Sequence, residues 1–285
     1  MTPSWTAQFR LSITRALADQ LATALEPLTP VPLTDEFLKA VEPRPGVYVL
    51  YLHGERVYVG KASISLQERL AQHKQKLSGR VGLSSDSVHF VCVYVDEDLD
   101  AAAPEKLLIK KYRATDSIPW NTNGFGNKDP GRNRDRSLVK AKHFDAAYPI
   151  DLETVVYLHP GRHTAARLLE IAKRELPYNL RFENKGTAKK TLERTLVTFR
   201  GGTISARDLM WLIISALPSG WQATALPGYL ILYHETNEYE SARVWWRRDP
   251  DGNVLSIVGP QRYEAGEVPG NDVDPEASDS DETLL

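Results

Sequence analysis

The stretch GVYVLYLHGERVYVG, residues 46–60, decides the fold. Its two runs of β-branched and aromatic residues, 46–52 and 56–60, are separated by a short turn that contains Gly54. Such runs favour strands, and a short connection with a glycine favours an antiparallel hairpin. The sequence therefore predicts a β-hairpin that carries Tyr48 on its first strand and Tyr58 on its second.

The segments that follow the hairpin alternate between helical and strand patterns. Residues 65–77 place leucines at helical spacing, and residues 88–95 form an apolar run typical of a buried strand. Residues 104–112 open with a proline, which suits the first turn of a helix. The order strand, strand, helix, strand, helix predicts an α+β domain with a small antiparallel sheet flanked by helices.

Polar residues suited to catalysis recur after the hairpin. Arg69 and His73 are four residues apart, so a helix projects both side chains from one face. Glu105 lies in the first turn of the next helix, and Asn121 follows Trp120 in the loop beyond it. Hydrolysis of a phosphodiester needs counter-charge for its transition state and a group that deprotonates water, and these residue types supply both.

The two tripeptides of the hairpin, with the residues that follow in order, resemble the GIY-YIG nucleases; the positions are Gly46-Val47-Tyr48, Tyr58-Val59-Gly60, Arg69, His73, Glu105 and Asn121. Valine replaces isoleucine in both tripeptides. The chain is most similar to the GIY-YIG type II restriction endonucleases, through Lys61-Ala62, the Arg-x-x-x-His helix, Trp120-Asn121 and the Gly124–Gly131 loop. The resemblance covers roughly residues 30–150, and it implies a GIY-YIG nuclease core.

The resemblance also implies a role for each of these side chains. Glu105 would hold one hydrated Mg²⁺, or Mn²⁺ in its place, with the substrate phosphate completing the ligands. Tyr48 would accept the proton of the attacking water, which requires an acidified phenol, and either Lys61 or the metal would lower its pKa. Arg69 would stabilise the phosphate charge, and His73 would orient Tyr48 or share the proton transfer.

Two assignments within this set leave alternatives open. Tyr58 would hydrogen-bond the phosphate or order the nucleophile. Asn121 would fix the tyrosines or complete the outer shell of the metal.

The distribution of charge favours a polyanionic partner. The net charge of −2 hides a basic body, because residues 46–150 carry 16 basic and 12 acidic residues while 250–285 carry 1 and 9. We expect double-stranded DNA to be the partner, since basic stripes neutralise phosphates. The expected contacts, either to base edges or to phosphates, lie in the turn-rich loop at Asn123, Asn127, Lys128, Arg132, Arg134 and Arg136.

The rest of the chain divides into three further parts. Residues 1–45 predict a helix over 7–27 and a linker, 151–265 a second α+β domain, and 266–285 an acidic disordered tail. No internal repeat is evident in the second half. Its patterns predict helices at 164–176 and 205–217, and strands near 179–183, 194–200, 228–234, 242–247 and 253–257. The block Trp245-Trp246-Arg247-Arg248 favours either an exposed aromatic beside two arginines or an edge strand with one buried tryptophan.

Composition excludes several classes of protein. No apolar stretch approaches the roughly 18 to 20 residues of a membrane helix, and the N-terminus lacks the pattern of a signal peptide. Cys92 is the single cysteine, so neither an internal disulfide nor a cysteine-based zinc site can form. We expect a cytoplasmic protein without a membrane partner.

These observations leave three functional hypotheses. The first is a site-selective double-strand endonuclease in restriction or anti-phage defence, which predicts a homodimer on DNA and a companion DNA methyltransferase or other defence proteins. The second is a structure-selective repair or mobile-element nuclease. The third is a DNA-binding effector whose nuclease fold is regulated or silent.

Overall fold

The computed structural model describes residues 13–84, 86–95, 104–115, 118–125 and 131–264. The residues between and beyond these ranges include part of the expected first helix, the loop residues Asn127 and Lys128, and the acidic tail 266–285. Those expectations therefore lie outside the described residues. None of the described helices combines the length and the apolar character needed to cross a membrane.

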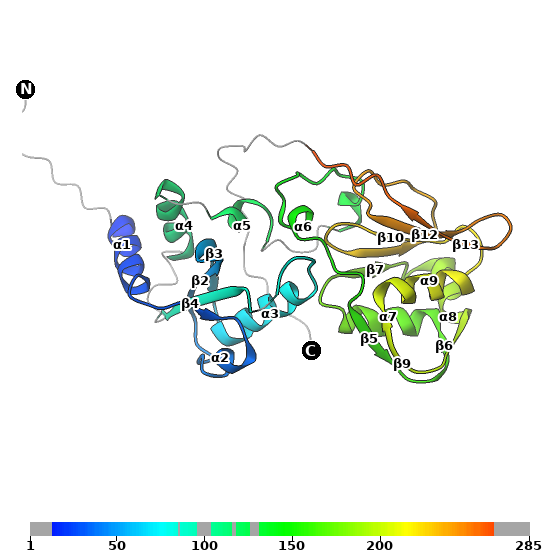
Figure 1. The fold of residues 1–285 in the computed structure, drawn as a ribbon, viewed down its shortest axis with the longest axis horizontal. Helices are drawn as coiled ribbons and strands as arrows, with labels where there is room; N and C mark the ends of the chain where they lie inside the picture. Colours follow the sequence, from blue (N-terminus) through cyan, green and yellow to red (C-terminus); the bar gives the residue numbers. More distant parts are fainter. Residues whose placement is uncertain (1–12, 85, 96–103, 116–117, 126–130, 265–285) are drawn as a thin grey trace, which may run out of the picture.

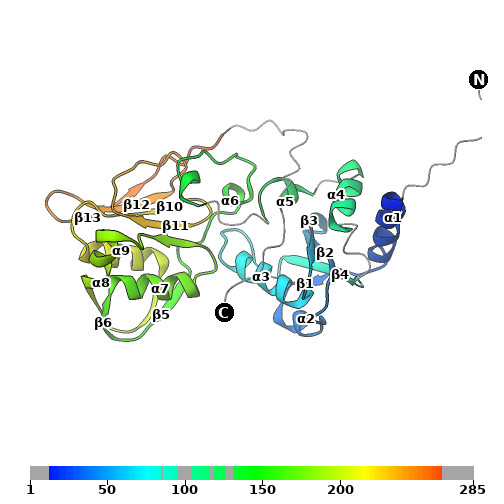
Figure 2. The same cartoon turned by 180° about the vertical axis from the view of Figure 1, so that it is seen from behind.

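The chain folds into two parts that lie side by side, with α1 at one end and β13 at the other (Figures 1 and 2). The elements of the N-terminal part are α1 (Ile13–Leu25), β1 (Val31–Pro32), α2 (Asp35–Lys39), β2 (Gly46–Leu52), β3 (Glu55–Ala62), α3 (Leu66–Ser78), β4 (Val88–Tyr94), α4 (Pro104–Thr115), α5 (Pro119–Thr122), the 3-10 helix η2 (Arg132–Arg134) and α6 (Phe144–Ala147).

The N-terminal part is a four-stranded sheet in the order β1-β4-β2-β3 between two layers of helices. The predicted hairpin is confirmed, because β2 pairs with β3 in antiparallel fashion across the His53-Gly54 turn. On one face, Tyr48 and Leu50 pack with residues of α2 and α3. On the other face, Val47 and Val59 pack with α1 and α4. This alternation buries both faces of β2, and Tyr48 and Tyr58 lie on the α3 side.

The segment 31–45, expected as a linker, contributes to this core. β1 pairs with β4, and Leu33, Leu38 and Val41 are buried in the same cluster as Tyr48. A boundary at residue 46 therefore does not separate the linker from the nuclease core. β1 was not predicted, because it lies in the proline-rich sequence 27–33 and a two-residue strand has no periodicity to recognise.

The C-terminal part has a larger core around a five-stranded sheet in the order β13-β12-β10-β11-β7. Its elements are β5 (Val155–Leu158), β6 (Gly161–Thr164), α7 (Ala165–Glu175), β7 (Leu180–Phe182), α8 (Gly186–Arg194), β8 (Leu196–Phe199), β9 (Gly202–Ser205), α9 (Ala206–Ala216), β10 (Gln222–Ala225), β11 (Leu230–Tyr233), β12 (Val244–Arg248) and β13 (Val254–Val258).

Both readings of the Trp245-Trp246 block are wrong. β12 is an interior strand, and Trp246 packs on the helix side of the sheet with 1% of its surface exposed. Trp245, 5% exposed, packs on the other side with Tyr239 and Ala242, which cover that face. Because both faces of the sheet are covered, neither ring is available for stacking on a base.

The C-terminal part also contains a repeat that the sequence analysis missed. Segment 155–164 pairs along its length with segment 196–205 in one continuous antiparallel register, interrupted at the centre. Each segment leads into a helix, and Thr164 and Ser205 accept equivalent capping bonds from Arg167 N–H and Asp208 N–H. Each position of the first unit corresponds to the position 41 residues later, so the two units are related by an approximate two-fold axis through the ribbon.

Candidate active site

The candidate active site lies where α3 crosses the hairpin. Ser65 caps α3 by accepting from the N–H of Glu68, which fixes the start of the helix one turn before Arg69. Leu66, Leu70 and Leu77 are fully buried beneath it. These contacts place Arg69 and His73 against the strand residues Tyr48 and Tyr58.

The two glycines of the hairpin make room for this arrangement. A β-carbon at Gly60 would collide with the phenol of Tyr48, and a β-carbon at Gly46 would collide with Leu66 and with the carbonyl oxygen of Val93. Glycine at 60 is therefore required for the Tyr48 ring to lie across β3. Glycine at 46 is required for α3 to approach the sheet.

Tyr48 lies at the centre of the cluster and has no exposed surface. Its hydroxyl is hydrogen-bonded to Nε2 of His73 at 2.6 Å, and its oxygen accepts from Arg69, which also donates to Tyr58. A further hydrogen bond joins the two phenols. Four of the residues expected in the site are thus directly connected.

The electrostatic state of the cluster is set by burial. Burial, followed by the neighbouring Tyr58, raises the pKa of Tyr48 well above its usual value, although Arg69 opposes the shift. Burial and the charge of Glu105 raise the pKa of Tyr58 to about 12. The acidified phenol that the sequence analysis requires is therefore absent from the protein on its own.

His73 is held neutral in this environment. Burial, together with the positive charges of Arg69 and Lys76, lowers its pKa well below the usual value. A neutral imidazole that carries its proton on Nδ1 can accept the Tyr48 proton at Nε2, and the 2.6 Å contact is short enough for this transfer. His73 is therefore placed to receive a proton from Tyr48.

Lys61 lies on a different side of the hairpin. It pairs with Val47 across the strands and shares the parity of Val59, so its side chain projects from the face of the sheet opposite Tyr48. The cation beside Tyr48 is Arg69. A direct effect of Lys61 on the Tyr48 phenol would require it to act around the edge strand β3.

Glu105 is the residue in this region that can hold a divalent cation. It lies half-buried in the first turn of α4, and its charge acts on both Tyr48 and Tyr58. Across the described ranges, no three histidine, cysteine or acidic side chains gather as a metal-binding group. A single carboxylate fits a hydrated Mg²⁺ ion, which keeps several waters and binds substrate phosphate, better than it fits a dehydrated cage.

Asn121 acts on the main chain of the edge strand. Its side-chain amide accepts from the N–H of Val59 and donates to the carbonyl oxygen of Val59, both at 2.8 Å. These two bonds close part of the open edge of β3 next to Tyr58. Of the two roles expected for Asn121, this geometry favours fixing the tyrosine strand over contacting a metal.

Two residues that the sequence analysis did not assign to the site complete it. The ring of Phe125 stacks on His73 at 4.9 Å between centroids and meets Tyr58 edge to face at 5.0 Å. Lys76 donates to the carbonyl oxygen of Phe125 and lies over its ring, and burial lowers the pKa of Lys76 to about 8. Its position three residues after His73, on the same helix face, was the signal available in the sequence.

The expected DNA-contact residues are spread along the segment that leads to the C-terminal part. Arg132 pairs with Glu183 at 3.0 Å and Glu235 at 3.6 Å and lies over the ring of Tyr233. Arg134 and Arg136 are exposed, whereas Asn123 is half-buried. Their contact with DNA stays a prediction.

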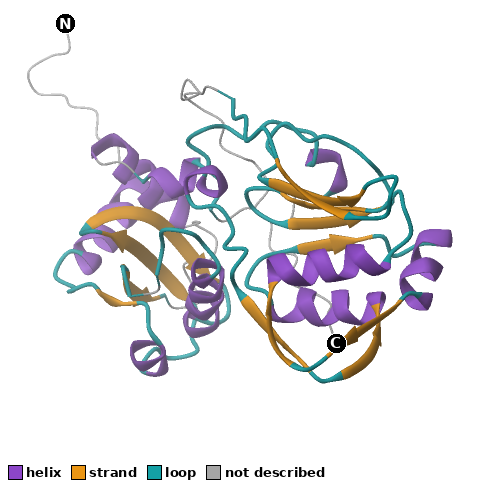
Figure 3. Cartoon of the chain, turned by 45° about the vertical axis from the view of Figure 1, so that its right-hand side comes forward, coloured by secondary structure: helices purple, strands orange, loops and turns teal. Residues whose placement is uncertain are grey.

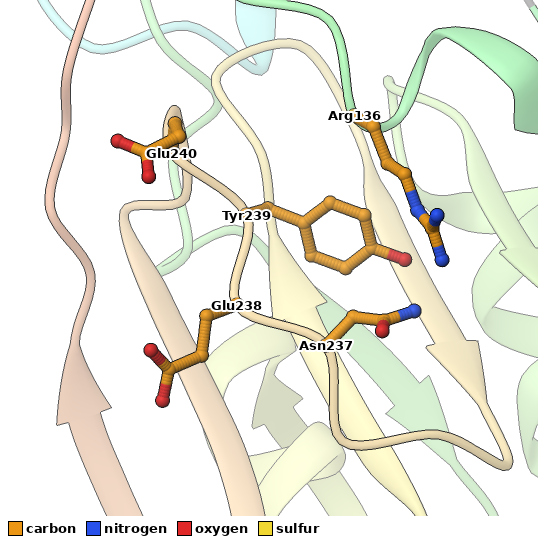
Figure 4. A pocket seen from close by; sticks show the side chains of 5 residues that line it. All are labelled: Arg136, Asn237, Glu238, Tyr239 and Glu240. Atoms are coloured by element: carbon orange, nitrogen blue, oxygen red, sulfur yellow. The ribbon is translucent and has the colours of Figure 1, made fainter.

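A separate pocket of about 300 Å³ lies in the C-terminal part (Figure 4); it is lined by Arg136, Asn237, Glu238, Tyr239 and Glu240. The ring of Tyr239 and the amide of Asn237 face Arg136, while the two glutamates point away from it. No member of the phenol cluster lines this pocket. The chemistry of the candidate site therefore belongs to the cluster around Tyr48.

This geometry coincides with a family match. Residues 44–118 match the GIY-YIG catalytic domain. The match covers about a quarter of the chain and includes the two tyrosines, Arg69, His73 and Glu105, whereas Asn121 lies just beyond it. No curated protein matches the chain. A GIY-YIG catalytic domain implies a nuclease, with DNA as the substrate.

Proposed function

We propose that this protein is a metal-dependent DNA endonuclease that cuts both strands at selected sites, in restriction or anti-phage defence. The connected cluster of Tyr48, Tyr58, Arg69 and His73, with Glu105 in electrostatic reach, carries the proposal. The restriction subtype is supported by the resemblance at Lys61, Trp120 and the 124–131 loop. The proposed role places the protein in the cytoplasm.

In the proposed reaction, Arg69 meets the scissile phosphate. Its guanidinium is partly exposed and already oriented by the two phenol oxygens, so it can add hydrogen bonds to phosphate without rearranging. Glu105 would hold the divalent ion, which when bound would supply positive charge to the phosphate and acidity to water. Both contributions stabilise the extra negative charge of the transition state.

The proton of the attacking water passes to the pair of phenols. Tyr48 is linked to His73 through a 2.6 Å hydrogen bond, so accepting a proton from water and delivering its own to Nε2 can be coupled. Because burial raises the pKa of Tyr48 in the protein alone, added positive charge is needed to favour the phenolate, and a divalent ion held at Glu105 would supply it. Phe125 shields the imidazole from bulk water on its other side.

One such site cuts one strand, so double-strand cleavage requires two copies of the chain on the DNA. We propose a homodimer, formed at least on DNA, and a C-terminal domain over residues 151–265 that contributes to target choice. Its separate core and its basic residues between 159 and 200 support a role of this domain in target choice.

Mapping cleaved ends tests the proposal. Purified protein with Mg²⁺ or Mn²⁺ should convert unmodified phage and plasmid DNA into discrete fragments with ends at one short sequence, and modified DNA from the natural host should resist. Ends that cluster at branches or nicks would contradict the restriction role in favour of a structure-selective nuclease. Intact DNA under all conditions would contradict nuclease function.

A further inference from the structure

The ribbon formed by segments 155–164 and 196–205 has one buried and one exposed face. Val156, Leu158 and Val197 point into the core beneath α7 and α9. Figure 1 shows β5, β9 and β6 curving along the rim of the C-terminal part below α7 and α8, and Figure 3 shows the same strands at its outer edge. Several of the outward side chains are exposed to solvent.

The two segments of the ribbon are basic and contain no acidic residue, although Glu175 of α7 accepts a hydrogen bond from the N–H of Tyr157. Their centre carries His159, Arg162 and Arg200, all exposed. Around this centre lie uncharged side chains; the exposed ones are Val155, Tyr157, Leu196, Thr198 and Thr203. Val155 and Tyr157 are more than half exposed, at 57% and 54%, and the Tyr157 ring meets His159 edge to face, so these side chains form part of one exposed patch.

The two ribbon arginines differ from several other arginines of the C-terminal part. Arg167, Arg174, Arg207, Arg247 and Arg262 each pair with a carboxylate. Neither Arg162 nor Arg200 makes an ion pair with any residue that the structure describes. Their charges are therefore available to an external anion.

Helix α8 extends the basic surface on one side of the ribbon only. This helix is inserted between the two repeat units and contacts β6. Residues 185–194 carry Lys185, Lys189, Lys190 and Arg194 against a single acid, Glu193. The second unit has no equivalent helix, so the basic flank belongs to the first unit alone.

We infer that the exposed face of this ribbon binds double-stranded DNA in the major groove, with the basic side of α8 against the flanking phosphates. The major groove admits a two-stranded antiparallel ribbon, and outward side chains of such a ribbon reach base edges. Arginine pairs with guanine, threonine hydrogen-bonds to bases, and apolar side chains contact the thymine methyl group. The inference rests on the proposed function for the choice of DNA, and it assigns target choice to a surface outside the GIY-YIG domain.

The repeat predicts an asymmetric target for this surface. The approximate two-fold axis makes His159 equivalent to Arg200 and Arg162 equivalent to Thr203. Equivalent positions with different side chains read different bases, so the two halves of the ribbon contact different sequences. Each chain then reads a non-palindromic stretch, and a palindrome arises only when two chains bind.

DNA binding is measured by fluorescence anisotropy in the Glu105→Ala background, so that cleavage does not consume the DNA. The probe is a labelled duplex that carries the mapped cleavage site. If no site has been mapped, a duplex of mixed sequence is used. The double variant Arg162→Ala/Arg200→Ala should bind at least tenfold more weakly than its parent, with a shallower dependence of affinity on salt. Arg262→Ala, which removes an exposed arginine paired with Glu240, is the matched control and should bind as the parent does. The exposed variant Tyr157→Ser provides a second probe and should also weaken binding.

Unchanged affinity of the double variant, or an equal loss in Arg262→Ala, would overturn the inference. Sedimentation measures the oligomeric state and tests whether a second copy of the chain covers the ribbon instead of DNA. If Val155→Ser/Tyr157→Ser converted a dimer into monomers without weakening DNA binding, the ribbon would be an interface between two copies. Binding in this background is independent of catalysis. If wild-type protein cut no DNA while the ribbon variants lost binding, the proposed function would fail and the ribbon assignment would stand.

Discussion

At the scale of single residues, the site depends on a close approach between Gly60 and Tyr48. The phenol of Tyr48 crosses β3 where any β-carbon at position 60 would occupy its place. Packed interiors transmit such a collision to their neighbours, and here the neighbours are His73 and Arg69. A single methyl group therefore tests whether the position of the phenol matters for catalysis.

Gly60→Ala should reduce the rate of strand scission by at least about tenfold, with a loss of roughly 1–3 kcal/mol in the free energy of unfolding. The rate is measured in single turnover and the stability by urea unfolding. A variant that kept the wild-type rate despite the collision would show that the phenol position is not catalytic.

The raised pKa values of the two phenols predict how cleavage depends on pH. If a phenolate is the form that accepts the proton, its fraction rises about tenfold per pH unit below the pKa. At constant Mg²⁺, the logarithm of the single-turnover rate should therefore climb with a slope near one between about pH 6 and 9. Tyr94→Phe, which alters a phenol near Glu42 outside the cluster, should leave this profile unchanged. A plateau that begins below about pH 7 would argue against a buried tyrosine as the base.

At the scale of elements, the side chain of Asn121 binds helix α5 to the edge of the hairpin. Asn121 replaces a missing neighbouring strand by pairing with both main-chain groups of Val59. Asn121→Asp keeps the acceptor for the Val59 N–H but sets a carboxylate against the Val59 carbonyl oxygen.

We expect Asn121→Asp to destabilise the fold by roughly 1–3 kcal/mol, since a buried acceptor loses its donor. The free energy of unfolding and the cleavage rate should fall together, because β3 carries Tyr58. The matched control is Thr122→Ala at the exposed neighbouring position, where both quantities should stay near the wild-type values. A large fall in cleavage at unchanged stability would instead indicate that Asn121 contacts the substrate.

The elements that the sequence predicted are those with strong local patterns. The hairpin, α3, α4, α7 and α9 follow from β-branched runs, leucine spacing and caps, and the expected order of Tyr48, Arg69 and His73 along them brings those three together. The missed elements depend on distant partners. The strands β5 and β6 are defined by pairing with β9 and β8, some 40 residues away, and no local periodicity encodes that register.

Side-chain roles show the same limit. The partner of Asn121 is main chain, which no motif reveals, and the burial of Trp245 depends on residues 239–242 folding over the sheet. The side of the sheet occupied by Lys61 follows from strand parity and could have been inferred from the predicted hairpin.

At the scale of the whole molecule, a buried ion pair joins the two parts. Asp135, 2% exposed, accepts from Arg181 and from the hydroxyl of Tyr229, both in the C-terminal part. The segment that carries Asp135 follows the loop whose Phe125 stacks on His73. The junction and the candidate site are thus linked through one loop.

Removing one partner of a buried pair leaves the other charge uncompensated. Asp135→Ala should therefore lower the free energy of unfolding by about 3–5 kcal/mol and speed hydrogen exchange in β7 and β11. Glu240→Ala, which breaks the exposed pair with Arg262, should cost less than about 1 kcal/mol. Equal effects of the two substitutions would show that the junction at Asp135 does not hold the parts together.

The claim that the Tyr48 cluster and Glu105 form a nuclease active site is tested most directly by single-turnover cleavage of supercoiled plasmid with Mg²⁺, using the wild type and Glu105→Gln. The substitution keeps the size of the side chain and removes its charge. The wild type should nick and linearise the plasmid, and Glu105→Gln should do so about a hundredfold more slowly or not at all while still binding DNA. Equal cleavage by the two proteins, or none by the wild type, would contradict the assignment.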